Sequence, residues 1–184
     1  MATEDHAPAL RQGLAALCRR LQTQGPASGE QMMAAAEELL QLRQRMGGKG
    51  LWRRPPRLLT ATLDDAIGQG LALIERFAAA IGMVVTPLGL RRPPDAIVHA
   101  CHDYRPAFLG LTVLWLDSEA DLALVARQLP SETRLIAGGP AFRYDPDLAT
   151  RCGVHHVAAD AAGFMAFMLA HSEGEADGHV GSGV

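Results

Sequence analysis

The sequence is poor in the residues that mark several common classes of protein. Its three cysteines, Cys18, Cys101 and Cys152, form no Cys-x-x-Cys pair, which argues against a zinc site and against a disulfide framework. No apolar run is long enough to cross a membrane, and the acidic N-terminus does not resemble a signal peptide. The simplest interpretation is a cytoplasmic protein with reduced thiols and no membrane partner.

Strong charge of one sign is also missing. The 17 basic and 20 acidic residues give a net charge of −3, so a nucleic-acid partner, which needs a clustered basic face, is not expected. The one basic run, Arg53, Arg54 and Arg57, is broken by two prolines and is best interpreted as a solvated connector, with a phosphate or partner contact as the alternative. The chain has neither a Gly-x-Ser-x-Gly elbow nor a P-loop lysine, and we do not expect it to be catalytic by itself.

What the chain does contain is, first, a helical segment over residues 1–52. Leu10, Leu14 and Leu17 repeat with helical spacing in one helix, and Ser28 can cap a second helix over 30–46. Two short helices cannot bury both of their faces alone. They are expected to pack on the rest of the chain as a cap, or on another copy as a dimerisation segment.

From residue 57 the pattern changes to alternating strands and helices. Hydrophobic residues make up 48% of the chain, enough for a substantial core. The alternation predicts an α/β fold over 57–171, a five-stranded parallel sheet of the flavodoxin or Rossmann-like type with helices on both faces. The polar, glycine-rich segment 172–184 is expected to be a disordered tail. The expected strands are 57–62, 83–89, 107–115, 133–139 and 154–159, and the expected helices are 67–81, 93–104, 117–129, 145–152 and 160–170.

Ligands of such sheets bind beyond the carboxyl ends of the strands, where the strand order switches. The loops at that edge contain four aspartates, whose ordinary role is to cap helix N-termini. A weaker alternative is an enzyme that uses these aspartates as a carboxylate pair, although nothing in the sequence indicates that two of them are held close together. The aspartates are Asp64, Asp65, Asp117 and Asp160.

The histidines of the α/β part are predicted at the opposite edge of the sheet. His155 and His156 are adjacent in a strand and should point to opposite faces, which disfavours a metal site. The glycines are more informative. Gly68 falls in the first turn of a helix, where glycine costs stability. Gly138 and Gly139 lie at the end of a strand and leave the sheet edge there without side chains. Tight packing and simple turns are the alternatives to close approach by a ligand.

Over residues 58–169 the chain resembles the cobalamin (B12)-binding domain family. In that family the first strand leads into Asp-x-His-x-x-Gly, whose histidine is the lower axial ligand of cobalt, and "LDDAIG" aligns with this motif. Gly68 matches the motif glycine and Ile67 the residue before it. The further matching positions are Pro87 to Gly89, Thr112, Gly138 and Gly139, and Asp160 and Ala161.

The sequence departs from the family at the metal ligand. Asp65 occupies the histidine position, Leu63 occupies the aspartate position, and a carboxylate is a poor substitute for imidazole under cobalt. Three alternatives remain open. Cobalamin binds without a protein ligand to cobalt, with Asp65 hydrogen-bonded to a corrin amide or an axial water; haem or another flat tetrapyrrole binds; or the pocket is empty. Trp52 and Trp115 are expected in the core, with covering of an apolar ligand face as the alternative.

The resemblance therefore implies a degenerate corrinoid-binding protein that acts as a sensor, regulator or carrier for a partner protein such as a methyltransferase, or as a homo-oligomer. A ligand-free or haem-binding interaction module of the same fold is the alternative. No catalytic residue and no metal-ligating residue is expected. The residues expected to contact the cofactor are Asp64, Asp65, Ile67, Gly68, Leu88, Gly89, Thr112, Leu114, Gly138, Gly139, Pro140, Ala159 and Asp160.

Overall fold

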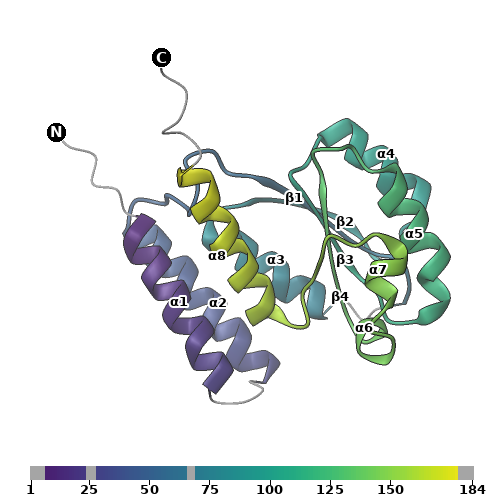
Figure 1. Ribbon diagram of the computed structural model, residues 1–184. Helices are drawn as coiled ribbons and strands as arrows, with labels where there is room; N and C mark the ends of the chain where they lie inside the picture. Colours follow the sequence, from purple (N-terminus) through teal and green to yellow (C-terminus); the bar gives the residue numbers. More distant parts are fainter. Residues whose placement is uncertain (1–6, 24–27, 66–68, 178–184) are drawn as a thin grey trace.

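A computed structural model describes residues 7–23, 28–65 and 69–177 of the chain (Figure 1). Its centre is a sheet of five parallel strands in the order β2-β1-β3-β4-β5. The predicted fold class is thus confirmed. The strands are β1 (Arg57–Thr62), β2 (Val84–Gly89), β3 (Phe108–Thr112), β4 (Arg134–Gly138) and β5 (His156–Val157).

Helices cover both faces of the sheet, because successive side chains of each strand point to opposite faces. Leu58 belongs to a core cluster with residues of the helices α3 (Gln69–Ile81) and α8 (Ala161–Asp177). The next residue, Leu59, belongs to a second cluster on the other face. That face is covered by α4 (Pro94–Tyr104), α5 (Glu119–Gln128), α6 (Ala141–Tyr144) and α7 (Leu148–Cys152), with the 3-10 turn η1 (Leu116–Ser118) before α5.

The helices α1 (Ala7–Thr23) and α2 (Gly29–Arg45) form an outer layer against α3 and α8 (Figure 1). Ser28 caps α2 as predicted: its hydroxyl accepts a hydrogen bond from the Gln31 amide at 3.2 Å, and the Gln31 side chain accepts one from the Ser28 amide. Leu10 and Leu14 are buried in the same cluster as Phe164 of α8. The helical pair therefore packs on the remainder of the chain, one of the two arrangements expected from the sequence.

Two glycines allow the segment after α2 to lie directly against the end of α3. A Cβ atom added to Gly50 would lie 2.6 Å from the Cα atom of Gly82, and a Cβ atom on Gly82 would meet Gly50 even more closely. Gly82 also has a φ of +99°, which side chains of L-residues rarely adopt. The amide of Leu51 then donates to the carbonyl of Ile81 at 2.9 Å, which fixes the connection to β1.

Four strands are shorter than the sequence predicts, and β3 and β5 differ the most. β3 ends at Thr112 rather than at residue 115, because the amides of Leu114 and Trp115 turn toward a side chain of another loop. β5 has two residues, and the ring Nδ1 of His155 accepts the hydrogen bond from the Leu135 amide at 3.0 Å. The Leu135 amide, which a longer β5 would have paired with a backbone carbonyl, is thus hydrogen-bonded to a side chain. The short helix α6 was not predicted.

The segment expected as a disordered tail is helical in its first part, since α8 continues to Asp177. The prediction was wrong there because Ser172 is buried and held by a distant residue. The guanidinium of Arg11 donates to the Ser172 hydroxyl at 2.7 Å and to the Ser172 carbonyl at 3.1 Å. Among the described residues, no helix is both long and apolar enough to cross a membrane.

Candidate functional site

The strand order switches between β1 and β3, so the loops that follow these two strands diverge in opposite directions. A crevice of this kind is the usual ligand site of a parallel sheet. Residues 63–65 lie in one of the two loops and residues 113–118 in the other. Ile67 and Gly68, two of the predicted site residues, lie outside the described residues.

Asp64 joins the two loops across the switch point. Its Oδ2 accepts hydrogen bonds from the amides of Leu114 at 2.8 Å and Trp115 at 3.1 Å, and from the hydroxyl of Ser118 at 3.2 Å. Its Oδ1 is buried and has no hydrogen-bond partner among the described residues. Asp64 thus binds the loop after β3, a contact that was not predicted from the sequence, where a capping role was expected.

Asp65, at the position of the family histidine, pairs with Arg91 of the loop after β2. The Arg91 Nε lies 2.7 Å from Asp65 Oδ1, and both side chains are largely exposed. The backbone of the same loop binds the end of β1, because the amides of Arg91 and Arg92 donate to the hydroxyl and carbonyl of Thr62 at 2.8 Å. Asp65 thus has a cationic partner at the surface.

The predicted residues at the ends of the other strands lie along the same edge. Leu88 and Gly89 end β2, Gly89 with a φ of +104°, and Pro140 precedes α6. Ala159 and Asp160 are exposed before α8, and the Asp160 Oδ1 accepts from the Gly163 amide at 2.8 Å, which is the capping role expected for an aspartate.

The two glycines after β4 have a structural reason that the sequence did not reveal. A Cβ atom on Gly138 would lie 2.6 Å from the carbonyl oxygen of Ala158. Gly139 has a φ of +116°, and a Cβ atom on it would collide with the carbonyl oxygen of Val113. Backbone crowding between neighbouring strands therefore excludes side chains here, whether or not a ligand also approaches.

On the α3 and α8 side, the carboxyl half of the sheet is lined by small and hydroxyl-bearing residues. The amino half of that face carries Leu58 and Phe108, which are buried in the core. Further along the same strands Thr60 and Gly110 lie in register with the buried Ile136, and Thr62, Thr112 and Gly138 form the next row on this face. A strand of a parallel sheet covered on both faces is usually rich in valine, isoleucine and leucine, so this patch is an exception. We call it the small-residue floor.

Gly110 differs from the crowded glycines. A Cβ atom added there would make ordinary contacts of 3.5 Å to Leu58, 3.6 Å to Thr60 and 3.7 Å to the carbonyl oxygen of Leu59, and all three neighbours belong to β1. The backbone therefore does not require glycine at this position. A larger side chain at this position would project from the sheet toward the helices that cover this face.

Apolar side chains are exposed at the same edge. Trp52 is buried as expected, with 6% of its surface exposed, but Trp115 is 60% exposed, so the expectation of core packing was wrong for Trp115. Trp115 is exposed because it lies beyond the end of β3, where the Trp115 amide donates a hydrogen bond to Asp64.

His156 of β5 lies in the aromatic packing beneath α8, in register with Ile136 of β4, while His155 before it is exposed. The His156 ring stacks on Phe167 with ring centroids 4.0 Å apart, and its buried Nε2 has no hydrogen-bond partner among the described residues. Burial lowers the pKa of His156 from its ordinary value. The described part of the chain contains no cluster of three or more potential metal ligands.

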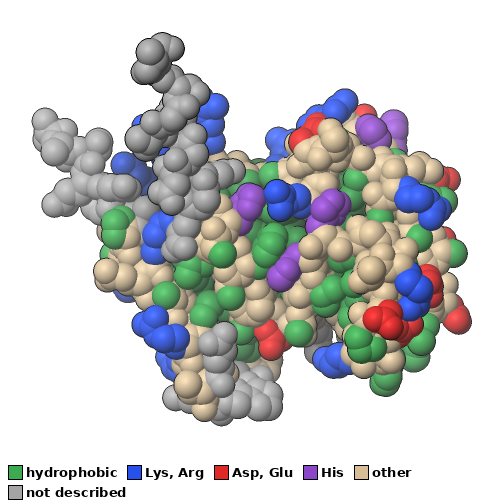
Figure 2. All heavy atoms as spheres, in the orientation of Figure 1, with side chains coloured by type: hydrophobic (Ala, Val, Ile, Leu, Met, Phe, Trp, Pro, Cys, Tyr) green, Lys and Arg blue, Asp and Glu red, His purple; other side chains and the backbone are tan. Residues whose placement is uncertain are grey.

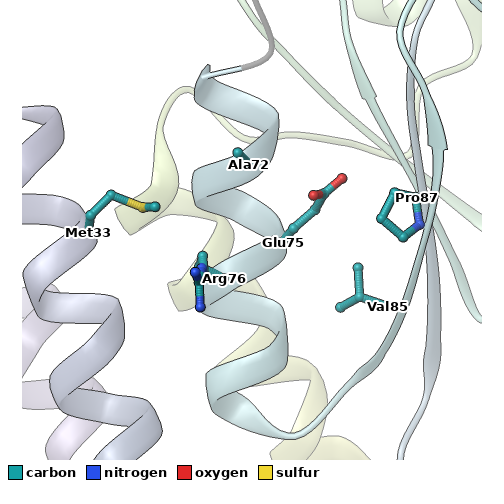
Figure 3. A pocket seen from close by; sticks show the side chains of 6 residues that line it. All are labelled: Met33, Ala72, Glu75, Arg76, Val85 and Pro87. Carbon is teal, nitrogen blue, oxygen red and sulfur yellow. The ribbon is translucent and has the colours of Figure 1, made fainter.

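A cavity of about 360 Å³ lies beside the floor, between α2, α3 and β2 (Figure 3). Met33, Ala72, Val85 and Pro87 form its apolar wall, and Arg76 completes the lining. The carboxylate of Glu75 is directed toward the sheet and accepts a hydrogen bond from the buried Thr60 hydroxyl at 2.6 Å (Figure 3). Glu75 was not predicted from the sequence, where it is one of several acidic residues on a helix.

No family model and no curated protein matches the sequence. Solved structures do match the fold. A cobalamin-binding protein from Desulfitobacterium hafniense is similar with a TM-score of 0.76 at 19% identity, over 90% of this chain and 81% of that one. The monomethylamine corrinoid protein of Methanosarcina barkeri gives 0.57 at 15% identity, over 88% and 80% of the two chains.

A third match is the methanol:cobalamin methyltransferase complex of Methanosarcina barkeri, with a TM-score of 0.64 at 18% identity, over 94% of this chain and 68% of that one. The chain is thus an α/β protein with a parallel five-stranded sheet and an outer helical layer. It shares this fold with cobalamin-binding proteins.

Proposed function

We propose that this chain binds a corrinoid at the carboxyl edge of its sheet without supplying a ligand to the cobalt. The observation that carries the proposal is the small-residue floor, which begins at Thr60 and Gly110 and continues to Thr62, Thr112 and Gly138. It has small and hydroxyl-bearing side chains where a parallel sheet normally has bulky apolar ones. The hydroxyls of Thr60 and Thr62 are bonded to Glu75 and to the loops after β1 and β2. A nucleotide-like tail needs this combination of space and hydrogen-bonding groups.

The residues present suit the tail of such a group and do not suit its metal. In this proposal Thr112 and Gly110 contact the tail, and Leu88 and Gly89, which end β2 beyond β1, contact the cofactor further along the edge. The loops of the carboxyl edge contain no histidine, and the carboxylate of Asp65 is paired with Arg91. When bound, a corrinoid would supply a cobalt ion that exchanges ligands, and this chain would hold and orient the macrocycle.

The protein then acts through a partner, as a sensor, regulator or carrier. The matching structures include a corrinoid protein and a complex that contains a methyltransferase, which supports a protein partner. We favour a sensory or regulatory role over methyl transfer, because a chain that supplies no ligand to the cobalt would have no direct means of controlling its reactivity.

A ligand-free interaction module is the second candidate, and Asp64 is the observation that favours it. Its three hydrogen bonds tie together the two loops that would otherwise diverge at the switch point. If this bridge does not open for a ligand, the chain keeps the fold without the cofactor.

Equilibrium dialysis with hydroxocobalamin separates the two candidates. Wild type should retain the corrinoid, with haem tested in parallel by its Soret band. Gly110→Val should lose retention, because the added side chain fills the space over the floor while its Cβ atom makes only ordinary contacts. Gly29→Val is the matched control, since a Cβ atom at Gly29 meets nothing within 4 Å. Absence of corrinoid on wild type would refute corrinoid binding and leave the ligand-free module.

A further inference from the structure

The cavity of about 360 Å³ between α2, α3 and β2 is separate from the residues proposed to contact the corrinoid (Figure 3). It lies beside β2, the strand at one border of the sheet, and none of its six lining residues belongs to that set. Its volume is at the lower end of the range of about 300–1,000 Å³ that small-molecule sites occupy. The cavity is thus large enough for a small ligand of its own.

Two adjacent side chains of opposite charge, Glu75 and Arg76, line this cavity. The Oε1 atom of Glu75 accepts a hydrogen bond from the buried Thr60 hydroxyl at 2.6 Å, which fixes the carboxylate. Its Oε2 atom accepts no hydrogen bond from the described residues and is not fully buried. Arg76 is exposed and has no ion pair in the part of the chain that the structure describes. Both charged groups are therefore available to a ligand.

The two charges project from different sides of α3, because consecutive residues of an α-helix are turned by about 100°. Figure 3 shows the Glu75 carboxylate directed toward β2 and Arg76 on the side of α3 nearer to α2. Ala72, about one helical turn before them, is exposed and has only a short side chain. A small ligand that lies over Ala72 can therefore meet both charges at once.

The rest of the lining is apolar. Met33 of α2 is 40% exposed, although it is a large hydrophobic residue, and Val85 and Pro87 of β2 face it across the cavity (Figure 3). Methionine side chains adapt their shape to apolar ligands. In small-molecule sites, apolar walls bury the body of the ligand and a few polar groups fix its orientation. This cavity combines an acceptor for an ammonium group, a donor for a carboxylate and an apolar wall.

We propose that the cavity binds a small apolar α-amino acid in its zwitterionic form. The ammonium group donates to Glu75 Oε2, and the carboxylate accepts from the guanidinium of Arg76. The side chain of the ligand lies against Met33 and Val85. Arginine suits this role because its guanidinium can donate two parallel hydrogen bonds to a carboxylate. The site goes beyond the proposed function and does not depend on whether a corrinoid binds.

Isothermal titration calorimetry of the wild-type protein with L-leucine and three analogues tests the three parts of the site. 4-Methylpentanoate lacks the amino group, 3-methylbutylamine lacks the carboxylate, and glycine lacks the apolar side chain. Each should bind at least about tenfold more weakly than L-leucine. No binding of L-leucine at millimolar concentration would refute the site. Equal affinities of L-leucine and 3-methylbutylamine would assign the cavity to an organic cation and overturn the amino-acid ligand.

Removing the charge of Glu75 tests the ammonium contact. Glu75→Gln keeps an oxygen acceptor for the Thr60 hydroxyl, so the fold should be retained, and L-leucine binding should weaken about tenfold to a hundredfold. Glu30→Gln is the matched control, because Glu30 is an exposed residue of the first turn of α2 that does not line the cavity. It should change the affinity by less than about twofold. Equal affinities of Glu75→Gln and wild type would overturn the proposal.

Filling the cavity tests the location of the ligand. Ala72→Leu should abolish L-leucine binding, and the exposed position of Ala72 favours retention of the fold. Ala34→Leu makes the same change at an exposed residue of α2 outside the cavity and should bind as wild type does. Unchanged binding by Ala72→Leu would place the ligand elsewhere and overturn the inference.

Repeating the L-leucine titration in the presence of hydroxocobalamin separates this site from the proposed function. The affinity for L-leucine should stay within about threefold of its value without the corrinoid. Loss of L-leucine binding when the corrinoid is bound would make the cavity part of the corrinoid site and overturn the inference. Binding of L-leucine by a protein that retains no corrinoid would refute corrinoid binding and support the amino-acid site.

Discussion

Replacing Asp64 should loosen the switch point of the sheet. In Asp64→Ala the amides of Leu114 and Trp115 and the hydroxyl of Ser118 lose their common acceptor. Hydrogen bonds to a charged group contribute about 1.5–3 kcal/mol each, but these donors are only partly buried and water replaces part of the loss. We expect the free energy of unfolding to fall by about 2–4 kcal/mol in total.

Urea unfolding measures this change, and amide hydrogen exchange locates it. The amides of Leu114 and Trp115 should exchange faster in Asp64→Ala than in wild type. The amides of the buried core strands should remain the slowest to exchange in both proteins. Asp117→Ala is the matched control, because Asp117 is an exposed acidic residue on the next turn, η1. A loss of stability below about 0.5 kcal/mol, the size of an ordinary surface change, with unaltered exchange would refute the bridging role.

Three further substitutions give separate expectations. Asp65→His should tighten corrinoid binding and shift its visible spectrum, whereas Asp65→Asn, which also breaks the pair with Arg91, should do neither; identical spectra of the two variants would count against a ring held over this loop. Gly82→Ala should lower the free energy of unfolding by about 2 kcal/mol or more in urea, because its φ of +99° and its contact with Gly50 exclude a side chain; a stability equal to wild type would contradict this close approach. Burial lowers the pKa of His156 from 6.5, so the unfolded state takes up the proton first and the free energy of unfolding falls as the pH decreases below about 6.5. His156→Phe should flatten that acid limb in thermal unfolding at a series of pH values, and an unchanged limb would show that another group causes it.

The regular elements were largely predictable because their signals are local. β1 begins and ends at the predicted residues, Arg57 and Thr62, since one apolar run lies between a proline pair and an acidic loop. The Ser28 cap was also read correctly, because a capping box spans only four positions. The helical layer was harder, since the sequence allowed packing on this chain or on a second copy.

The site was less predictable because its contacts join residues far apart in the sequence. Nothing local to Asp64 indicates that it binds the amides of Leu114 and Trp115, and a capping role was the natural expectation. Trp115 was expected in the core because its residue type is usually buried. The reason for glycine at 138 depends on the carbonyl of Ala158, which only the paired strands bring close.

Electron paramagnetic resonance of the protein with bound cob(II)alamin tests the central claim most directly. A corrinoid held through its tail and ring, with no protein ligand beneath it, gives a cobalt(II) signal without nitrogen superhyperfine splitting. The account predicts this signal on the wild-type protein after desalting, and the appearance of nitrogen splitting in Asp65→His. Nitrogen splitting from a ligand of the wild-type protein, or the absence of any bound cobalt signal, would contradict it.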